Sequence, residues 1–322
     1  MNILICSVGR RVQLINYFKK ELNKVDGKVI AVDCDPTAPA LYHADRFEIV
    51  PRIDHPEYIS ILKNLCHAYK INGVLSLIDP ELTLLSSFKE EFEKDGIHIF
   101  VSDKNAIDIC YDKYLTHIFL QENDIPSVPT YIDLDVVRQD LNEGKLTFPL
   151  IVKPRYGSGS VGVQKVTNYT GLLELWEMTD DLIVQPFIDG SEYCVECYID
   201  ILTKEPSNLF SKRKINMRAG ETDKSIAIKD PILIDTTYKL IEALKPSGPI
   251  DIDYFQTKDG YMLSEINPRF GGGYPYAYEM GQNFIKSMIN NLNGIPNASY
   301  DKYLGDYEEG KTMVRYDHFI IL

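Results

Sequence analysis

The sequence has no long apolar run and no excess of positive charge. No stretch of about 18 apolar residues occurs in it, and residues 1–6 start the chain as a strand-like segment with no charged leader. We therefore expect a cytoplasmic protein with no membrane partner. The formal net charge of −13 argues against a nucleic-acid partner, although an acidic protein can still form a local basic cleft for an anionic ligand.

Cysteine is scarce and does not form a framework. Cys194 and Cys197 make a C-x-x-C pair, but in an alternating strand their side chains project to opposite faces, unlike those of a redox pair or a zinc knuckle. We expect all of the cysteines to be buried thiols in a reducing compartment. They are Cys6, Cys34, Cys66, Cys110, Cys194 and Cys197.

Common nucleotide-binding motifs are also absent. The sequence has no G-x-x-x-x-G-K-[S/T] loop, and it lacks the H-R-D and D-F-G triplets of protein kinases. The first strand-to-helix turn holds a single glycine, Gly9, instead of the three of a dinucleotide fingerprint. Asp33 does end the second strand, where a ribose-binding acid would lie. A nicotinamide site is therefore the weaker alternative, and we expect Asp33 to make capping contacts.

Residues 1–103 alternate between short apolar segments and segments with helical spacing. Strands are expected at residues 3–7, 29–33, 47–50, 74–77 and 98–101, and helices at residues 12–23, 56–70 and 80–94. This alternation predicts an α/β fold with a parallel, doubly wound sheet, which binds ligands at the carboxyl ends of its strands. Arg10 and Arg11 lie at that edge. They either hold a carboxylate or phosphate or are exposed first-turn arginines.

The pattern changes around residues 103–130, where we place a domain boundary, and the rest of the chain mixes helices and strands. Further helices are expected at residues 105–110, 113–122, 134–144, 236–244 and 275–293, and a closing strand at residues 312–322. Residues 204–230 are polar. We expect a solvated loop there, and the alternative is a mobile basic loop that closes over phosphates.

A glycine-rich segment follows an apolar strand that ends at Lys153. Its expected phosphate-facing residues are Gly157, Ser158, Gly159, Ser160 and Gly162. The glycines satisfy G-x-G-x-x-G, but the dinucleotide motif opens a helix, whereas alternating valines continue this segment as a strand. Such a flap suits a triphosphate, because glycine lets backbone amides approach phosphate oxygens and serine adds hydroxyl donors. The alternative is a flexible glycine hairpin.

The segment at residues 182–193 joins an apolar strand to an exposed extended stretch. Backbone N–H and C=O groups of such a stretch can meet an adenine edge while apolar side chains enclose the ring. The expected hinge residues are Gln185, Pro186, Phe187 and Ile188. Glu192 would then lie where a ribose hydroxyl is bound. Taken alone, the segment is equally explained as a core strand with a turn.

Charged and apolar side chains alternate in the segment MLSEINPRFGGG near the end of the chain. Glu265, Asn267 and Arg269 fall at every second residue, so they share one face of a strand and suit a metal and a phosphate. A three-residue turn, KDG, would pair this strand with the preceding one and place Asp253 opposite Glu265 and Asp251 opposite Asn267. A cation would relieve the repulsion among these carboxylates. The alternative is an ordinary solvent-facing hairpin.

The order of lysine, glycine flap, extended hinge and acidic hairpin resembles that of the ATP-grasp superfamily over essentially the whole chain. The chain is most similar to the large-subunit group of carbamoyl phosphate synthase, reduced to one unit. The resemblance implies a pre-ATP-grasp domain at residues 1–111 and an ATP-grasp domain of two α+β subdomains at residues 112–322. The small nucleotide-clasping subdomain would span about 113–185, and the metal-binding subdomain about 186–322.

The resemblance also implies roles for single residues. Lys113 and Lys153 match the lysines that contact the nucleotide and its phosphates, and Arg269 matches the arginine that stabilises the transferring phosphoryl group, so Arg269 and Lys153 are the expected catalytic residues. The flap matches the loop over the phosphates, and the hinge with Glu192 matches the adenine and ribose site. The expected ligands of Mg²⁺, with Mn²⁺ as the alternative ion, are Asp253, Glu265 and Asn267. Many members carry glutamate where this chain has aspartate at 253, which shortens the reach but keeps oxygen ligation.

The implied activity is that of an ATP-dependent ligase. Such an enzyme phosphorylates a small-molecule carboxylate to an acyl phosphate and couples it to an amine, releasing ADP and phosphate. The alternatives are a carbamoyl phosphate synthase-like enzyme that phosphorylates carbamate or bicarbonate, and a nucleotide-binding protein without turnover. The expected partners are the carboxylate and amine substrates, and a homodimer is compatible with the resemblance. The nucleotide site says little about which acid and amine are used.

Overall fold

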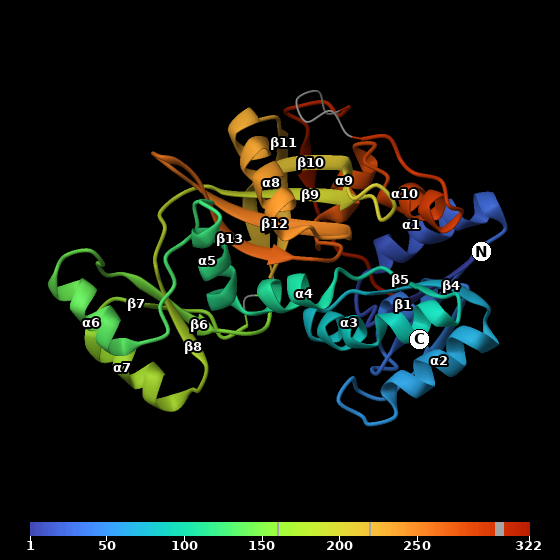
Figure 1. The fold of residues 1–322 in the computed structure, drawn as a ribbon, viewed down its shortest axis with the longest axis horizontal. Helices are drawn as coiled ribbons and strands as arrows, with labels where there is room; N and C mark the ends of the chain where they lie inside the picture. The colour runs from blue at the N-terminus through green and yellow to red at the C-terminus, as the bar shows by residue number, and fades with distance from the viewer. Residues whose placement is uncertain (160, 219, 300–305) are drawn as a thin grey trace.

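The described part of the chain folds around three β-sheets (Figure 1). The computed structural model describes residues 1–159, 161–218, 220–299 and 306–322, so the flap residue Ser160 lies outside the described residues. A parallel five-stranded sheet comes first, and the other sheets are antiparallel, with three and six strands. The predicted α/β class with an α+β C-terminal part is therefore confirmed. Among the described residues, no helix combines the length and apolar composition needed to span a membrane.

The amino-terminal sheet has the order β3-β2-β1-β4-β5, and all of its pairings are parallel. Its strands are β1 (Asn2–Cys6), β2 (Lys28–Asp33), β3 (Arg46–Ile49), β4 (Ile71–Ser76) and β5 (His98–Ile99). Its main helices are α1 (Val12–Leu22), α2 (Tyr58–Ala68) and α3 (Asp79–Lys94). Parallel pairing needs such crossover helices, and they cover both faces, which explains why the central strand β1 is a continuous apolar run.

The turn after β1 lies at the carboxyl edge of this sheet and is held by Asp33. The Gly9 amide donates to Asp33 Oδ2 at 2.8 Å, and the Asp35 amide donates to Asp33 Oδ1 at 2.9 Å. Gly9 has a φ of 47°, where glycine is favoured. Asp33 is therefore a capping residue, as predicted, and it fixes the turn that carries Arg10 and Arg11.

The six-stranded sheet has the order β13-β12-β9-β10-β11-β14. Its strands are β9 (Glu192–Ile199), β10 (Pro206–Arg218), β11 (Glu221–Ile228), β12 (Gly248–Thr257), β13 (Gly260–Asn267) and β14 (Thr312–Val314). The expected helices that lead to it are confirmed as α4 (Lys104–Tyr111) and α5 (Lys113–Glu122), and a third as α8 (Pro231–Leu244). Apolar side chains of α8 and the central strands form one buried cluster beneath the sheet.

The prediction of a solvated loop at residues 204–230 is wrong, because this segment forms the antiparallel strand pair β10 and β11. Leu209 and Phe210 are fully buried, and Lys212 is only 1% exposed. One side of the pair borders the cavity described below, and Lys212 and Lys214 both line that cavity. Lys212 and Lys214 therefore face that cavity, whereas Lys204, Arg218 and Lys224 of the same segment are exposed to solvent.

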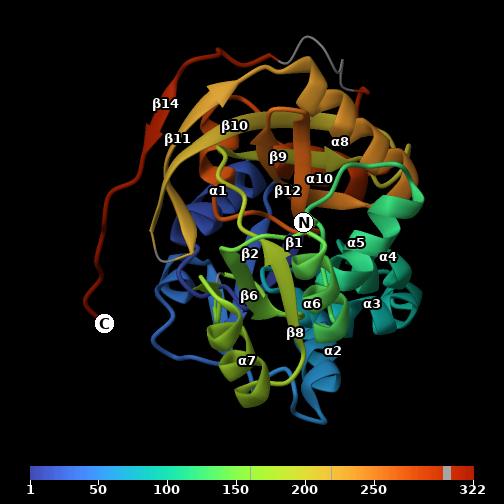
Figure 2. The same ribbon diagram turned by 90° about the vertical axis from the view of Figure 1, so that its left-hand side faces the viewer.

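Two predictions near the C-terminus are also wrong in part. The helix expected at residues 275–293 is broken into α9 (Tyr274–Glu279) and α10 (Phe284–Leu292), because Gly281 has a φ of 90° and Asn283 caps the second helix. The strand expected at residues 312–322 pairs with β11 only over Thr312–Val314. Beyond it the chain continues without regular structure, as Figure 2 shows, and Phe319 is 91% exposed. Strand pairing is stabilised mainly by side chains that pack against neighbouring strands, and an exposed side chain such as that of Phe319 has no such contact.

The smallest sheet has the order β7-β6-β8 and lies on the left of Figure 1. Its strands are β6 (Leu150–Pro154), β7 (Gln164–Val166) and β8 (Leu182–Pro186), and its helices are α6 (Leu134–Asn142) and α7 (Tyr169–Met178). The strand after the glycine-rich segment begins later than expected. Val161 and Val163 therefore lie in the flap loop, 77% and 42% exposed.

Candidate active site

A cavity of about 580 Å³, a volume typical of small-molecule sites, is bordered by strands of the two antiparallel sheets and by the turns after β1 and β4. The predicted site residues on its wall are Lys113, Lys153, Gly157, Ser158, Gly159, Gln185, Pro186, Phe187, Ile188, Glu192, Asp253, Glu265, Asn267 and Arg269. Gly162 does not border the cavity. It packs beside Pro154, where an added Cβ would lie 3.0 Å from a ring carbon. The fold thus brings the flap, the hinge and the acidic hairpin around one space.

The acidic hairpin β12–β13 has the predicted register, with Asp253 opposite Glu265. The expected three-residue turn is wrong, because Thr257 pairs directly with Gly260 and leaves a turn of two residues. That turn alone would put Asp253 opposite Ser264 and turn Glu265 toward the core. Ser264 instead forms a β-bulge, and the extra residue restores the facing of the acids.

The sequence contains a signal for this bulge. Tyr261 and Leu263 pack in the core at odd positions, whereas the next core residue, Ile266, is at an even position. A strand of strict period two cannot place all three on one face. The change of phase in the apolar alternation therefore marks the bulge.

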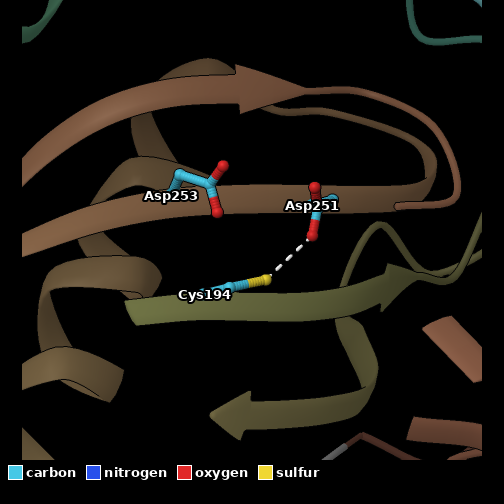
Figure 3. Close-up of side chains that lie close together, drawn as sticks. All are labelled: Cys194, Asp251 and Asp253. Carbon is cyan, nitrogen blue, oxygen red and sulfur yellow. Dashed lines mark hydrogen bonds between the residues drawn. The ribbon is translucent and has the colours of Figure 1, made fainter. Parts of the chain in front are cut away.

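Asp251 adds a further acid to this face of the hairpin. Sequence analysis paired it with Asn267 but did not assign it to the site. The Cys194 thiol donates to Asp251 Oδ1 at 2.9 Å, and one ligand atom each of Cys194, Asp251 and Asp253 lie within 4.8 Å of one another (Figure 3). Burial and the Asp251 carboxylate raise the pKa of Cys194, so the thiol stays protonated and donates.

The predicted facing of the C-x-x-C pair is confirmed. Cys194 borders the cavity, and Cys197 belongs to the apolar cluster beneath the sheet. Burial of the cysteines is confirmed except at Cys34, which is exposed. It follows β2 in the turn where Asp33 makes its capping contacts, so no element covers it.

Lys214 on β10 is a site residue that sequence reasoning missed. Its ammonium lies 2.7 Å from Asp253 Oδ1 and 3.6 Å from Glu192 Oε2, and its side chain is 8% exposed. Burial alone would lower the pKa of Lys214, but the Asp253 carboxylate outweighs this and raises it. Beside it, Lys212 and Glu196 form an ion pair in which each side chain is 1% exposed. The alternation of these lysines along β10 was the available signal.

Arg269 is held by an acid from the amino-terminal sheet. Its Nε and Nη2 atoms donate to the two carboxylate oxygens of Asp79, each at 2.9 Å, and both side chains are about nine-tenths buried. Arg269 also donates to Asn267 Oδ1 at 3.0 Å and to the Phe270 carbonyl at 3.1 Å. Asp79 opens α3, so this helix orients the arginine expected at the transferring phosphoryl group.

Two lysines reach the flap side of the cavity. Burial lowers the pKa of Lys153, although the charge of Glu265 opposes the shift. Lys113 donates to the Gly157 carbonyl at 2.6 Å. The residue before it, Asp112, caps α5 and accepts a bidentate pair from Arg155 at the base of the flap. The flap is therefore tied to the start of α5.

The hinge leaves one amide for a ligand. The Phe187 amide donates to the Pro149 carbonyl at 3.1 Å, and the Gln185 side chain donates to Thr130 Oγ1 at 2.8 Å. Among the hydrogen bonds of the described residues, the Ile188 amide has no partner. Of the hinge amides, we expect that of Ile188 to meet a base edge.

The acidic face fits a divalent cation of the kind that the sequence resemblance implies. Asp253, Glu265 and Asn267 offer oxygen donors to one cavity, and oxygen is the donor that Mg²⁺ prefers. Burial, opposed by Lys214, and repulsion from Asp251 and Glu265 raise the pKa of Asp253 to about 6. A cation would remove that repulsion.

Comparison with known proteins agrees with this geometry. Residues 3–100 match the model of the PylC-like N-terminal domain, and residues 110–273 match that of the ATP-grasp domain. A carbamoyl-phosphate synthase from Methanobrevibacter smithii is 26% identical, over 86% of this chain and 76% of its own length. A 3-methyl-D-ornithine–L-lysine ligase from Methanosarcina acetivorans is 26% identical, over 88% and 72%.

A solved structure adds to the fold comparison. The biotin carboxylase of Campylobacter jejuni superposes with a TM-score of 0.76, 16% identity and coverage of 97% of this chain and 74% of its own. At that identity the likeness shows a shared fold alone. The resemblance predicted from the order of motifs is confirmed, and the chain belongs to the ATP-grasp family.

Proposed function

We propose that this protein is an ATP-dependent ligase that phosphorylates a small-molecule carboxylate and couples the acyl phosphate to an amine, releasing ADP and phosphate. One observation supports the proposal above all. Lys153, Arg269 and the acidic residues of β12–β13 line the same cavity, and the chain belongs to the ATP-grasp family. We also propose the division into domains at residues 1–111 and 112–322, and a cytoplasmic location, where ATP is available.

Different groups along the cavity would bind different parts of ATP. The Ile188 amide would hold the adenine edge, Glu192 a ribose hydroxyl, and Lys153 with the flap amides the phosphate oxygens. Arg269, fixed by Asp79, would neutralise charge on the phosphoryl group as it moves to the substrate carboxylate. Asp253, Glu265 and Asn267 would hold Mg²⁺, which when bound neutralises phosphate charge. Burial keeps water from the acyl phosphate.

Carbamoyl phosphate synthesis is the second candidate. It is supported by the carbamoyl-phosphate synthase of Methanobrevibacter smithii, which this chain matches over 86% of its length. Ligation is preferred because a 3-methyl-D-ornithine–L-lysine ligase matches over a similar span, 88%, and the cavity has room for a small acid beside a nucleotide. Bicarbonate with ammonia as the productive pair would establish the second candidate.

The test is a screen for ADP release over amino acids and small carboxylates, each with and without an amine. Glu265→Ala is the negative control, because loss of an oxygen ligand removes productive metal geometry. Release that needs both an acid and an amine supports a ligase. Equal release by Glu265→Ala would refute the assigned site. Binding of Mg-ATP without release under any condition would favour a nucleotide-binding protein.

A further inference from the structure

Three arginines surround one carboxylate at the edge of the cavity. The arginine cluster consists of Arg10 and Arg11 in the turn after β1, Arg315 after β14, and Glu221 at the start of β11. Glu221 Oε1 lies 3.5 Å from both Arg10 Nη2 and Arg11 Nη1, and Glu221 Oε2 contacts Arg315 Nη1. Arg10, Arg11 and Glu221 border the same cavity as the acidic face.

The cluster carries two more positive charges than negative ones. Burial would raise the pKa of Glu221, but the charges of Arg11, Arg315 and Arg10 outweigh burial and lower it, so this carboxylate is ionised. Besides Glu221, the Asp251 carboxylate acts on Arg11, against the charges of Arg269 and Arg315. An excess of positive charge in a cavity of a protein with a net charge of −13 calls for an anionic ligand.

The N–H donors of the Arg11 guanidinium have no short contact with a carboxylate of the described residues. Its side chain is 22% exposed, and its charged partner among the described residues is Glu221 at 3.5 Å, beyond the usual length of an N–H···O hydrogen bond. A guanidinium that is mostly buried normally donates short, charge-assisted hydrogen bonds. Burial lowers the pKa of Arg11, and Glu221 opposes this. A ligand anion in the cavity would supply the missing acceptor.

Glycine places the cluster next to the phosphoryl-transfer end of the cavity. Gly272 follows Arg269 by three residues, and a Cβ there would lie 2.7 Å from Arg11 Nη1. Arg315 Nη2 donates to the Gly272 carbonyl at 2.6 Å. The charge of Arg269 itself acts on Arg11. A small molecule over this glycine segment would therefore meet Arg269 at one end and Arg11 at the other.

We propose that the arginine cluster binds an anionic group of the substrate other than ATP, a group separate from the one that reacts. This inference rests on the proposed function and narrows it to substrates with an anionic group besides the reacting one, such as a dicarboxylate, a phosphorylated acid or an amino acid that reacts through its amine. Glu221 holds the three guanidinium groups together and limits their attraction for the anion. Arg11 supplies the hydrogen bonds, and Arg10 adds positive charge at the border of the cavity.

The test measures anion binding with the phosphate positions of ATP already filled. The protein is saturated with Mg²⁺ and a non-hydrolysable ATP analogue, and inorganic phosphate, glutarate or butyrate is titrated by calorimetry at constant ionic strength. Butyrate is the matched probe, because it is glutarate without its second carboxylate. Tighter binding of phosphate than of glutarate indicates a phosphorylated substrate, and the reverse indicates a carboxylate.

Two variants with opposite expected effects on anion affinity distinguish a binding site from a cluster that only stabilises the fold. Arg11→Gln should weaken binding of the preferred anion roughly 10- to 100-fold, the range of hydrogen bonds between charged groups. Glu221→Gln should strengthen it roughly threefold to tenfold, because a competing negative charge is lost. A purely structural cluster would lose stability in both variants and gain binding in neither. Arg52→Gln, whose side chain is 77% exposed, is the control for loss of charge alone.

The outcomes decide between the two proposals. Weaker binding in Arg11→Gln with stronger binding in Glu221→Gln supports the subsite. No saturable binding of phosphate or glutarate, equal binding of glutarate and butyrate, or weaker binding in Glu221→Gln overturns it while leaving the ligase proposal intact. Failure of the ATP analogue to bind overturns both. The ADP-release screen adds a check, since each productive pair should include a substrate with an anionic group besides the reacting one.

Discussion

Asp79 is expected to act on catalysis through Arg269, although it lies on the amino-terminal sheet. Removing one partner of a buried ion pair costs about 3–5 kcal/mol, because the other charge is left without compensation. Arg269 keeps its bonds to Asn267 and to the Phe270 carbonyl, so we expect the lower end, about 3 kcal/mol, for Asp79→Ala. Asp79→Asn retains one acceptor and should cost roughly 1–2 kcal/mol.

The assay has two parts. Urea unfolding gives the loss of stability, and ADP release with a productive acid and amine gives kcat and KM. Because the guanidinium loses its bidentate orientation, we expect kcat to fall roughly 10- to 100-fold in Asp79→Asn while KM for ATP changes less than threefold. Asp79→Glu should recover part of kcat, which a purely structural role would not predict.

Asp103→Asn is the matched control. Asp103 pairs with Lys89 at 3.1 Å, but its side chain is 88% exposed, so the change should cost less than about 1 kcal/mol and leave kcat unaltered. The reasoning fails if Asp79→Asn keeps wild-type kcat while Arg269→Ala is inactive, because Arg269 would then hold its position without Asp79.

Four further variants test other parts of the fold. Gly220→Ala should weaken Mg-ATP binding in a calorimetric titration, because Gly220 has a φ of 75° and an added Cβ would lie 2.6 Å from the Gly159 carbonyl in the flap; unchanged affinity would contradict that contact. Gly273→Ala should lower the free energy of unfolding by roughly 1–3 kcal/mol, because its Cβ would meet Lys212 Nζ at 2.2 Å. Gly171→Ala in α7, where an added Cβ would lie at an ordinary contact distance of 3.6 Å from Asn168 Oδ1, should be neutral or stabilising by up to about 1 kcal/mol. A loss equal to that of Gly273→Ala would refute the packing argument. Burial, then the charges of Lys89 and Lys204, lower the pKa of His98 from 6.5 to about 4. The unfolded chain therefore binds more protons, and stability should fall by roughly 2–3 kcal/mol as the pH drops from 6.5 to 4, a loss that His98→Gln should reduce in urea unfolding at each pH.

Local patterns predicted most elements and most of the cavity wall. Strand and helix segments in the first 103 residues and the position of the flap follow from spacing along a few neighbouring residues. The facing of Asp253 and Glu265 was expected from a three-residue turn, and a two-residue turn with the bulge at Ser264 produces it instead. The pair of Asp79 and Arg269 could not be predicted in this way, because 190 positions separate the two residues and only the packed fold brings them together.

Residues 204–230 show why composition alone misleads. Charge along a segment normally indicates solvent, but the lysines of β10 are buried against acids from β9 and β12. Lys214 is neutralised by Asp253, and the two lie on strands far apart in sequence. The sequence records the charge of each side chain, whereas its partner depends on how the sheet is assembled.

The bulge at Ser264 separates two properties of the acidic hairpin. Which side chains face the cavity depends on the ladder, and a chain without Ser264 would still place Glu265 directly after Leu263 and opposite Asp253. How the strand bends depends on the bulge, because an unpaired residue adds local bending and twist. Chain length at this position can therefore change by one residue without moving an acid to the other face. Such a change would alter the curvature of the surface on which those acids stand.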